Sequence, residues 1–185
     1  MNKTQQNLAN AFAGESQARN RYTYFAKIAQ KEGYEQISNI FLETAENEKQ
    51  HAKMFYKLLG NGTFKIDSEY PFFLGTTIEN LKSAIAGEHE EWSKLYLNAS
   101  KIAKEEGELE ASNLFLQISE AEKHHEDRFF KLFKNIENGL VFKKITDVEW
   151  KCRKCGRIIK SSKAPDICPT CKHDKSYFEI LCENY

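Results

Sequence analysis

Two copies of a Glu-x-x-His motif constrain the fold of this chain more than any other feature of its sequence. The first copy is Glu48 with His51, and the second is Glu122 with His125. Residues i and i+3 of an α-helix share a face, so each copy directs one carboxylate and one imidazole to a common point. Apolar residues recur at helical spacing on the same face of both segments. The sequence therefore predicts that these ionisable groups point into a helical core.

Acidic groups in such a core require positive charge close by. A carboxylate moved into an apolar interior costs several kcal/mol even after relaxation, and the apolar stripes carry no lysine or arginine for a metal-free, salt-bridged core. Two further segments place one acid each, Glu15 and Glu88, on an apolar stripe. Two Glu-x-x-His helices and one Glu from each of two others form the core of a di-iron or di-manganese bundle. The predicted ligands are Glu15, Glu48, His51, Glu88, Glu122 and His125.

The spacing of apolar residues predicts four helices, over residues 4–31, 35–59, 76–106 and 108–135. Thr4 is the expected N-cap of the first helix, and Thr76 begins a capping-box pattern before the third. Residues 60–75 are rich in glycine and too long for a tight turn, which favours a crossover between the halves of a ferritin-like four-helix bundle. We expect this mainly α bundle over residues 1–137.

The two helix pairs form an internal repeat whose offset changes by one residue. Ala-Phe-Ala-Gly-Glu at 11–15 matches Ala-Ile-Ala-Gly-Glu at 84–88, but one extra residue separates Glu88 from Tyr96 compared with Glu15 from Tyr22. A helix absorbs a single insertion as a π-turn, and such turns favour functional sites. We expect a π-turn beside Glu91.

Three side chains of the repeat have open roles. Glu91 is either a surface acid or an additional metal ligand brought round by the π-turn. Tyr22 and Tyr96 occupy equivalent positions, where they hydrogen-bond the acids, donate protons or simply pack in the core.

After Gly139 the pattern changes to two short predicted strands, over residues 140–145 and 148–151. Two Cys-x-x-Cys pairs follow, a spacing that places four thiolates around one metal ion. The spacing alone fits zinc and iron equally well, whereas Cys182 is expected to be a free thiol. This tail, residues 138–185, is expected to be a separate β domain of the zinc-ribbon type that a metal stabilises, with ligands Cys152, Cys155, Cys168 and Cys171.

Composition excludes several classes of partner. Lys+Arg and Asp+Glu both total 27, so no basic excess favours nucleic acid or an anionic membrane. The sequence lacks an apolar run long enough to span a bilayer, and its N-terminus lacks the apolar core of a signal peptide. Cysteines paired for metal binding suit a reducing compartment, so we expect a cytoplasmic protein.

Six motifs are distributed over the whole chain: Ala-Gly-Glu-Ser-Gln-Ala-Arg (13–19), Glu-Lys-Gln-His (48–51), Gly-Glu-His-Glu-Glu (87–91), Glu-Lys-His-His (122–125), Trp-Lys-Cys-Arg-Lys-Cys-Gly (150–156) and Cys-Pro-Thr-Cys (168–171). Together they resemble the rubrerythrin family. The resemblance implies a non-haem di-iron peroxidase that reduces hydrogen peroxide to water and protects against oxidative stress, with Glu91 as a seventh di-iron ligand. It implies that one iron moves between Glu91 and His51 as its oxidation state changes, and that the tail is a rubredoxin-like Fe(Cys)4 domain.

The resemblance also implies a head-to-tail homodimer in which the Fe(Cys)4 centre of one subunit serves the di-iron site of the other. No Gly-x-Gly-x-x-Gly segment is present for NADH, so a rubredoxin, an NAD(P)H-dependent rubredoxin reductase or both must supply electrons. Arg157 and Lys172 depart from the residues usual in rubredoxin knuckles. Zinc or manganese can replace iron at such sites. Two other hypotheses are ferritin-like iron storage and a non-enzymatic zinc-ribbon interaction module.

Overall fold

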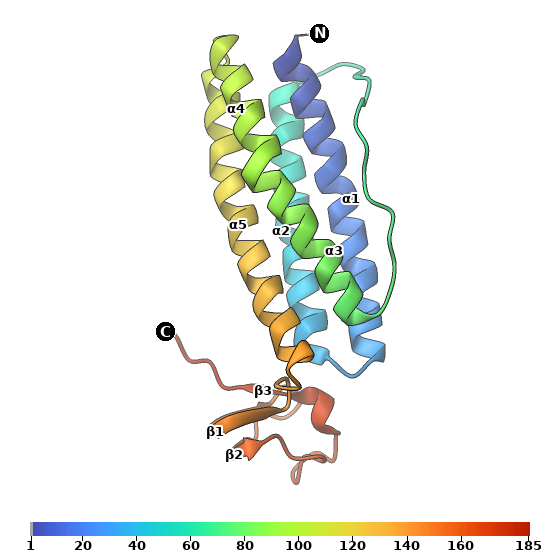
Figure 1. Ribbon diagram of the computed structural model, residues 1–185, viewed down its shortest axis with the longest axis vertical. Coiled ribbons are helices and arrows are strands. Elements are labelled where there is room, and N and C mark those ends of the chain that lie inside the picture. The colour runs from blue at the N-terminus through green and yellow to red at the C-terminus, as the bar shows by residue number, and fades with distance from the viewer. Residues whose placement is uncertain (1) are drawn as a thin grey trace.

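The helices of the computed structural model, which describes residues 2–185, form a long bundle with a small β domain at one end (Figure 1). α1 pairs with α2, and α5 pairs with the rod formed by α3 and α4. The predicted mainly α, ferritin-like bundle is therefore present. Its helices are α1 (Lys3–Lys31), α2 (Glu35–Leu59), α3 (Thr77–Glu90), α4 (Tyr96–Glu105) and α5 (Leu109–Glu137).

The helix ends follow local capping rules, with one correction to the sequence prediction. Thr4 is not the N-cap of α1, because Asn2 accepts a hydrogen bond from the backbone N–H of Gln5 at 2.8 Å, and the Gln5 side chain accepts one from the N–H of Asn2. Thr76 does cap α3, and the Glu79 carboxylate accepts its backbone N–H at 2.9 Å.

A π-helical segment, η1 (Glu91–Leu95), joins α3 to α4 without breaking the rod. This segment lies where the repeat offset changes, so the predicted π-turn is confirmed. The inserted residue widens one turn, so the residues that follow it face the core as their positions in the repeat predict.

Residues 60–76 form a strap that returns along the outside of the bundle beside α1 (Figure 1). The strap connects the end of α2 to the start of α3 at the opposite end of the bundle. This is the long crossover that the glycine-rich sequence predicted.

Two aromatic clusters fill the bundle on either side of its middle. Tyr22, Phe41 and Phe129 belong to one cluster, with ring centroids 5.1–5.9 Å apart. Phe55 and Phe115 belong to the other, 5.1 Å apart. In α2 and α5 the Glu-x-x-His motifs lie between these two positions. The apolar layers therefore flank a polar layer and hold it away from water.

The C-terminal domain contains a three-stranded antiparallel sheet in the order β2-β1-β3. One strand, β1 (Lys143–Cys152), replaces the two predicted short strands, and its pairing with β2 (Ile158–Lys163) is irregular between Lys143 and Val148. Trp150 is buried at the centre of the domain with β3 (Phe178–Ile180) beside it. The predicted boundary at residues 137–138 lies between α5 and β1, and the division into two domains stays a prediction.

The β domain packs against the turn between α1 and α2. Tyr34 stacks on Phe142 with ring centroids 6.2 Å apart and an interplanar angle of 4°. Gly33, at φ 82°, brings the turn close to Ser176.

Among the described residues, no helix is both long enough and apolar enough to cross a membrane.

Candidate metal centres

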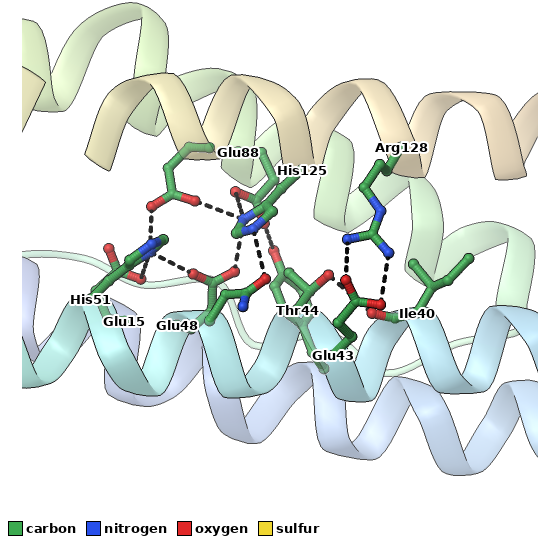
Figure 2. Close-up of polar contacts among 12 residues, drawn as sticks. Glu15, Ile40, Glu43, Thr44, Glu48, His51, Glu88, His125 and Arg128 are labelled. Carbon is green, nitrogen blue, oxygen red and sulfur yellow. Dashed lines mark hydrogen bonds and ion pairs between the residues drawn. The ribbon is translucent and has the colours of Figure 1, made fainter. Parts of the chain in front are cut away.

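The middle of the bundle holds two overlapping sets of four metal-ligating side chains, in which all ligand atoms lie within 4.8 Å of one another. One set is Glu15, Glu48, His51 and Glu122, and the other is Glu48, Glu88, Glu122 and His125. Figure 2 shows several of these side chains converging from the helices. All six residues predicted from the apolar stripes are thus brought together.

Glu48 and Glu122 belong to both sets because each directs one carboxylate oxygen toward His51 and the other toward His125. His51 Nδ1 lies 3.0 Å from Glu48 Oε2 and 2.8 Å from Glu122 Oε1. His125 Nδ1 lies 3.2 Å from Glu48 Oε1 and 2.8 Å from Glu122 Oε2. Glu15 completes the set around His51, and Glu88 completes the set around His125. Two cations held by these sets would therefore share Glu48 and Glu122 as ligands.

Two buried tyrosines bind the two non-bridging acids across the repeat. Tyr22 donates its hydroxyl hydrogen bond to Glu88 Oε1, and Tyr96 donates to Glu15 Oε1. Each tyrosine therefore leaves the other carboxylate oxygen, Oε2, facing the centre. Of the two interpretations of these tyrosines, hydrogen bonding to the acids is observed.

Burial and mutual repulsion of the acids determine their protonation. Burial, followed by the charges of Glu122 and Glu48, raises the pKa of Glu15 well above its usual range. Burial and the charge of Glu48 raise the pKa of Glu88 to about 8. Burial alone would lower the pKa of His51, but its contacts with Glu122 and Glu48 outweigh this effect and raise it to about 9. Without a metal, protons must hold the cluster together.

The unpartnered atoms of the cluster show that its residues fit two metal ions. Within residues 2–185, the inward-facing atoms of all six side chains have no hydrogen-bond partner of acceptable geometry, although oxygens and nitrogens approach closely. Orphaned buried polar atoms are costly, and a bound cation would satisfy them together. Carboxylate oxygen and imidazole nitrogen are ligands that iron and manganese accept. The atoms are Glu15 Oε2, both oxygens of Glu48 and of Glu122, Glu88 Oε2, and Nδ1 of His51 and of His125.

Asn47 supports the site, and sequence reasoning missed it. Its Oδ1 lies 3.3 Å from His125 Nε2, which donates the hydrogen bond and leaves Nδ1 free to face the carboxylates. One turn away on the same helix, Glu43 pairs with Arg128 through two contacts of 2.9 and 3.1 Å (Figure 2). The only sequence signal for Asn47 was its place beside Glu48 at the start of a motif.

Glu91 lies outside both sets of four. It is half-buried in η1 and lines a cavity of about 190 Å³ that also reaches Tyr96. Removal from water, followed by the charge of Glu88, raises the pKa of Glu91 well above its usual range. Its position next to the cluster keeps open the predicted role as an additional ligand, which stays a prediction.

The four predicted cysteines come together in the β domain. Cys152 Sγ lies 3.7 Å from Cys171 Sγ, and Cys155 Sγ lies 3.7 Å from Cys168 Sγ. A tetrahedral site with metal–sulfur bonds of about 2.3 Å has edges of about 3.8 Å, so the spacing fits one ion. The pKa of the Cys168 thiol is lowered to about 6, chiefly by a hydrogen bond from the backbone N–H of Cys171. Cys182 is an exposed free thiol.

The departure at Lys172 has a visible structural counterpart. Lys172 adopts φ 65°, the left-handed conformation that Gly156 adopts at φ 76° after the first Cys pair. Only glycine takes this conformation without steric cost. The turn after the second Cys pair therefore adopts the left-handed conformation although lysine disfavours it.

These features define a ferritin-like bundle with a carboxylate-bridged dinuclear metal centre and a tetrathiolate metal site. The bacterioferritin of Desulfovibrio desulfuricans has the same fold over 75% of this chain and 82% of its own, at 21% identity and a TM-score of 0.66. A mixed-valence nigerythrin structure covers 96% of this chain and 86% of its own, at 31% identity and a TM-score of 0.65.

Family comparisons cover both parts of the chain. The rubrerythrin family model matches residues 6–133, and the model of the rubredoxin-like domain of rubrerythrin matches residues 150–179. Rubrerythrins from Clostridium perfringens and Porphyromonas gingivalis are 53% and 49% identical, each over 99% of this chain and 96% and 92% of their own lengths. The chain belongs to the rubrerythrin family, with a di-iron carboxylate site and a four-cysteine iron site.

Replacing Asn47 by Ala should weaken metal binding by the bundle about 10- to 100-fold, because His125 loses the partner that orients its ring. Competition with a chelator for ferrous or cobalt ions, performed anaerobically, measures this change. Asn39→Ala is the control, since Asn39 lies on the same helix and its side chain bonds only the carbonyl of Glu35 among the described residues. Equal affinities for both variants would contradict the role of Asn47.

The metal-stripped bundle should lose stability as the pH rises from about 6.5 to about 9. His51 sets this window, because its folded pKa of about 9 lies above its ordinary value of 6.5. Glu88 has a folded pKa of about 8 against an ordinary value of 4.5, so the loss that it causes begins at lower pH. Stability that depends on bound protons is complete below the ordinary pKa and is lost as the pH passes the folded pKa. We expect a loss on the order of 3 kcal/mol in urea unfolding with a chelator present.

Metal-loaded protein should not show this loss, because bound cations replace the protons. His51→Gln should flatten the pH dependence, whereas His124→Gln, at an exposed position of α5, should leave it unchanged. A metal-stripped bundle with constant stability over this pH range would show that the acids are not held by shared protons.

Proposed function

We propose that this protein is a peroxidase that reduces hydrogen peroxide to two molecules of water with two electrons and two protons. The observation that carries the proposal is the pair of four-ligand sets that share Glu48 and Glu122. A second metal site in the same chain, built only from thiolates, supports electron transfer rather than iron storage. Such a protein protects the cell against oxidative stress, and its unpaired thiolates suit the cytoplasm.

Within this proposal, the side chains of the bundle bind metal and handle protons. A pair of iron ions held by the cluster would supply one electron each for cleavage of the O–O bond. Tyr96 and Tyr22 donate hydrogen bonds to Glu15 and Glu88, so their hydroxyl protons would be available at the cluster when the O–O bond breaks. Glu91 and His51 would serve as alternative ligands of one metal position when its oxidation state changes. Zinc or manganese would occupy the same ligands without supporting the same turnover.

The tetrathiolate centre relays electrons from outside the chain. A rubredoxin, an NAD(P)H-dependent rubredoxin reductase or both would reduce it, since the sequence has no dinucleotide-binding glycine motif. The β domain lies at the end of the bundle, whereas Glu48 lies about 20 Å along α2 from that end at 1.5 Å per residue. A head-to-tail homodimer would bring the centre of one subunit close to the cluster of the other.

Glu122→Ala should lower kcat for peroxide more than about 100-fold, because it removes a ligand of both metal positions and not only a supporting hydrogen bond. Glu120→Ala is the matched control, since Glu120 is exposed on the same helix. Turnover is measured by stopped-flow mixing of reduced, iron-loaded protein with hydrogen peroxide, and the visible spectrum reports the tetrathiolate iron. Undiminished turnover in Glu122→Ala would refute the assignment.

Cys168→Ser should stop turnover with a physiological electron donor but leave the bundle able to react once. After chemical reduction, the variant should consume about one equivalent of peroxide per dinuclear site, because the bundle ligands are unchanged. Cys182→Ser, which alters the exposed free thiol, should turn over normally. Normal steady-state turnover in Cys168→Ser would show that the thiolate site does not relay electrons.

A further inference from the structure

One cavity leads from the surface strap to the side chains proposed to act on peroxide. It measures about 190 Å³ and lies between α1, the strap and the π-bulged rod. Glu91 and Tyr96 contribute to its lining on one side, and Tyr70 of the strap contributes on the other. A water molecule occupies about 30 Å³ of liquid volume, so the cavity has room for a few molecules of that size.

The strap contacts α1 at Gln6, Asn10 and Gly14. These positions are four residues apart and therefore lie in one line along the helix. Gln6 donates a hydrogen bond to the carbonyl of Lys65 at 2.8 Å. The Asn10 side chain both donates to the carbonyl of Asp67 and accepts its N–H, each at 2.9 Å. These side-chain contacts replace the pairing that a strand would find in a sheet, and they fix the path of an otherwise irregular segment.

Tyr70 makes the third contact, next to the first ligand of the cluster. Its hydroxyl donates to the carbonyl of Asn10 at 2.7 Å, and its ring lies over Gly14. A Cβ at Gly14 would lie 3.3 Å from the ring, tighter than ordinary packing allows. Glycine at this position lets the ring close the cavity wall one residue from Glu15.

We propose that Tyr70 determines which peroxides reach Glu91, by forming a wall that admits hydrogen peroxide and excludes hydroperoxides that carry a bulky alkyl group. The proposal rests on the proposed function for its substrate, but the wall itself is a property of the strap. Small differences in a pocket change discrimination between substrates by about 10- to 200-fold. In this proposal, hydrogen peroxide passes the ring of Tyr70 without displacing it, whereas a branched alkyl group would have to displace the ring.

Cysteine labelling tests the wall independently of activity. Ala99 is buried and lines the cavity, so an Ala99→Cys change, in zinc-loaded protein that also carries Cys182→Ser, places a thiol inside it. Methyl and benzyl methanethiosulfonate then compete for that thiol, and peptide mass spectrometry gives both rates. With Tyr70 present, we expect the methyl reagent to react at least about 10-fold faster than the benzyl reagent, beyond their ratio on a free thiol.

Three strap variants identify the part of Tyr70 that matters. Tyr70→Ala should bring the two labelling rates together, whereas Tyr70→Phe, which keeps the ring, should largely preserve their difference. Phe72→Ala is the control, because Phe72 lies on the same strap but is 91% exposed. A benzyl rate equal to the methyl rate with Tyr70 present, or an unchanged ratio in Tyr70→Ala, overturns the proposal.

Kinetics of the iron-loaded protein complete the test. Tyr70→Ala should raise kcat/KM for tert-butyl hydroperoxide relative to hydrogen peroxide at least about 10-fold, and Phe72→Ala should not. If the protein reduces neither peroxide, the proposed function fails, while the labelling rates still decide whether Tyr70 is a wall. If it reduces hydrogen peroxide and the ratio does not move in Tyr70→Ala, only the role of Tyr70 fails.

Discussion

Mutual repulsion among buried carboxylates is the constraint on which the rest of this structure depends. Glu15, Glu48, Glu88 and Glu122 are each at most 1% exposed and share one small volume with two imidazoles. Two protonated histidines do not neutralise four ionised acids. Burial and the charges of the neighbouring acids therefore raise the pKa values of Glu15 and Glu88, so that these two acids hold protons. Two divalent cations provide the missing charge without those protons. The bundle is therefore a scaffold whose centre is unfavourable until metal binds.

The aromatic clusters above and below this centre make the repulsion strong and the geometry stable. Phe41, Phe129, Phe55 and Phe115 are fully buried and keep water from both sides of the polar layer. Low polarity strengthens every charge–charge interaction between them, attractive as well as repulsive. Close packing also leaves the acids little freedom to turn toward solvent. The same layers that destabilise the metal-stripped protein thus increase its selectivity for a charged occupant.

Sequence periodicity predicted much of this site because its ligands lie on helices. Glu48 and His51 share a helical face whatever the tertiary contacts are, and a one-residue change in the repeat offset was enough to predict η1. Contacts made by irregular backbone have no such rule. The clamp between Asn10 and Asp67 depends on the path of the strap, and the bond from His125 to Asn47 depends on how two helices face each other. Neither could be derived from spacing alone.

The two halves of the bundle are nearly equivalent, and the departures from equivalence lie together. Tyr22 bonds Glu88 while Tyr96 bonds Glu15, so each half supports the acid of the other. Among residues 2–185, the π-segment exists in the second half only, and the strap crosses the bundle once, yet both line the cavity beside Glu91. A symmetric pair of ligand sets would present equal surfaces to an oxidant. Because both departures meet on one side, the surroundings of the two ligand sets are unequal, and under the proposed function substrate access and ligand exchange would belong to the same face.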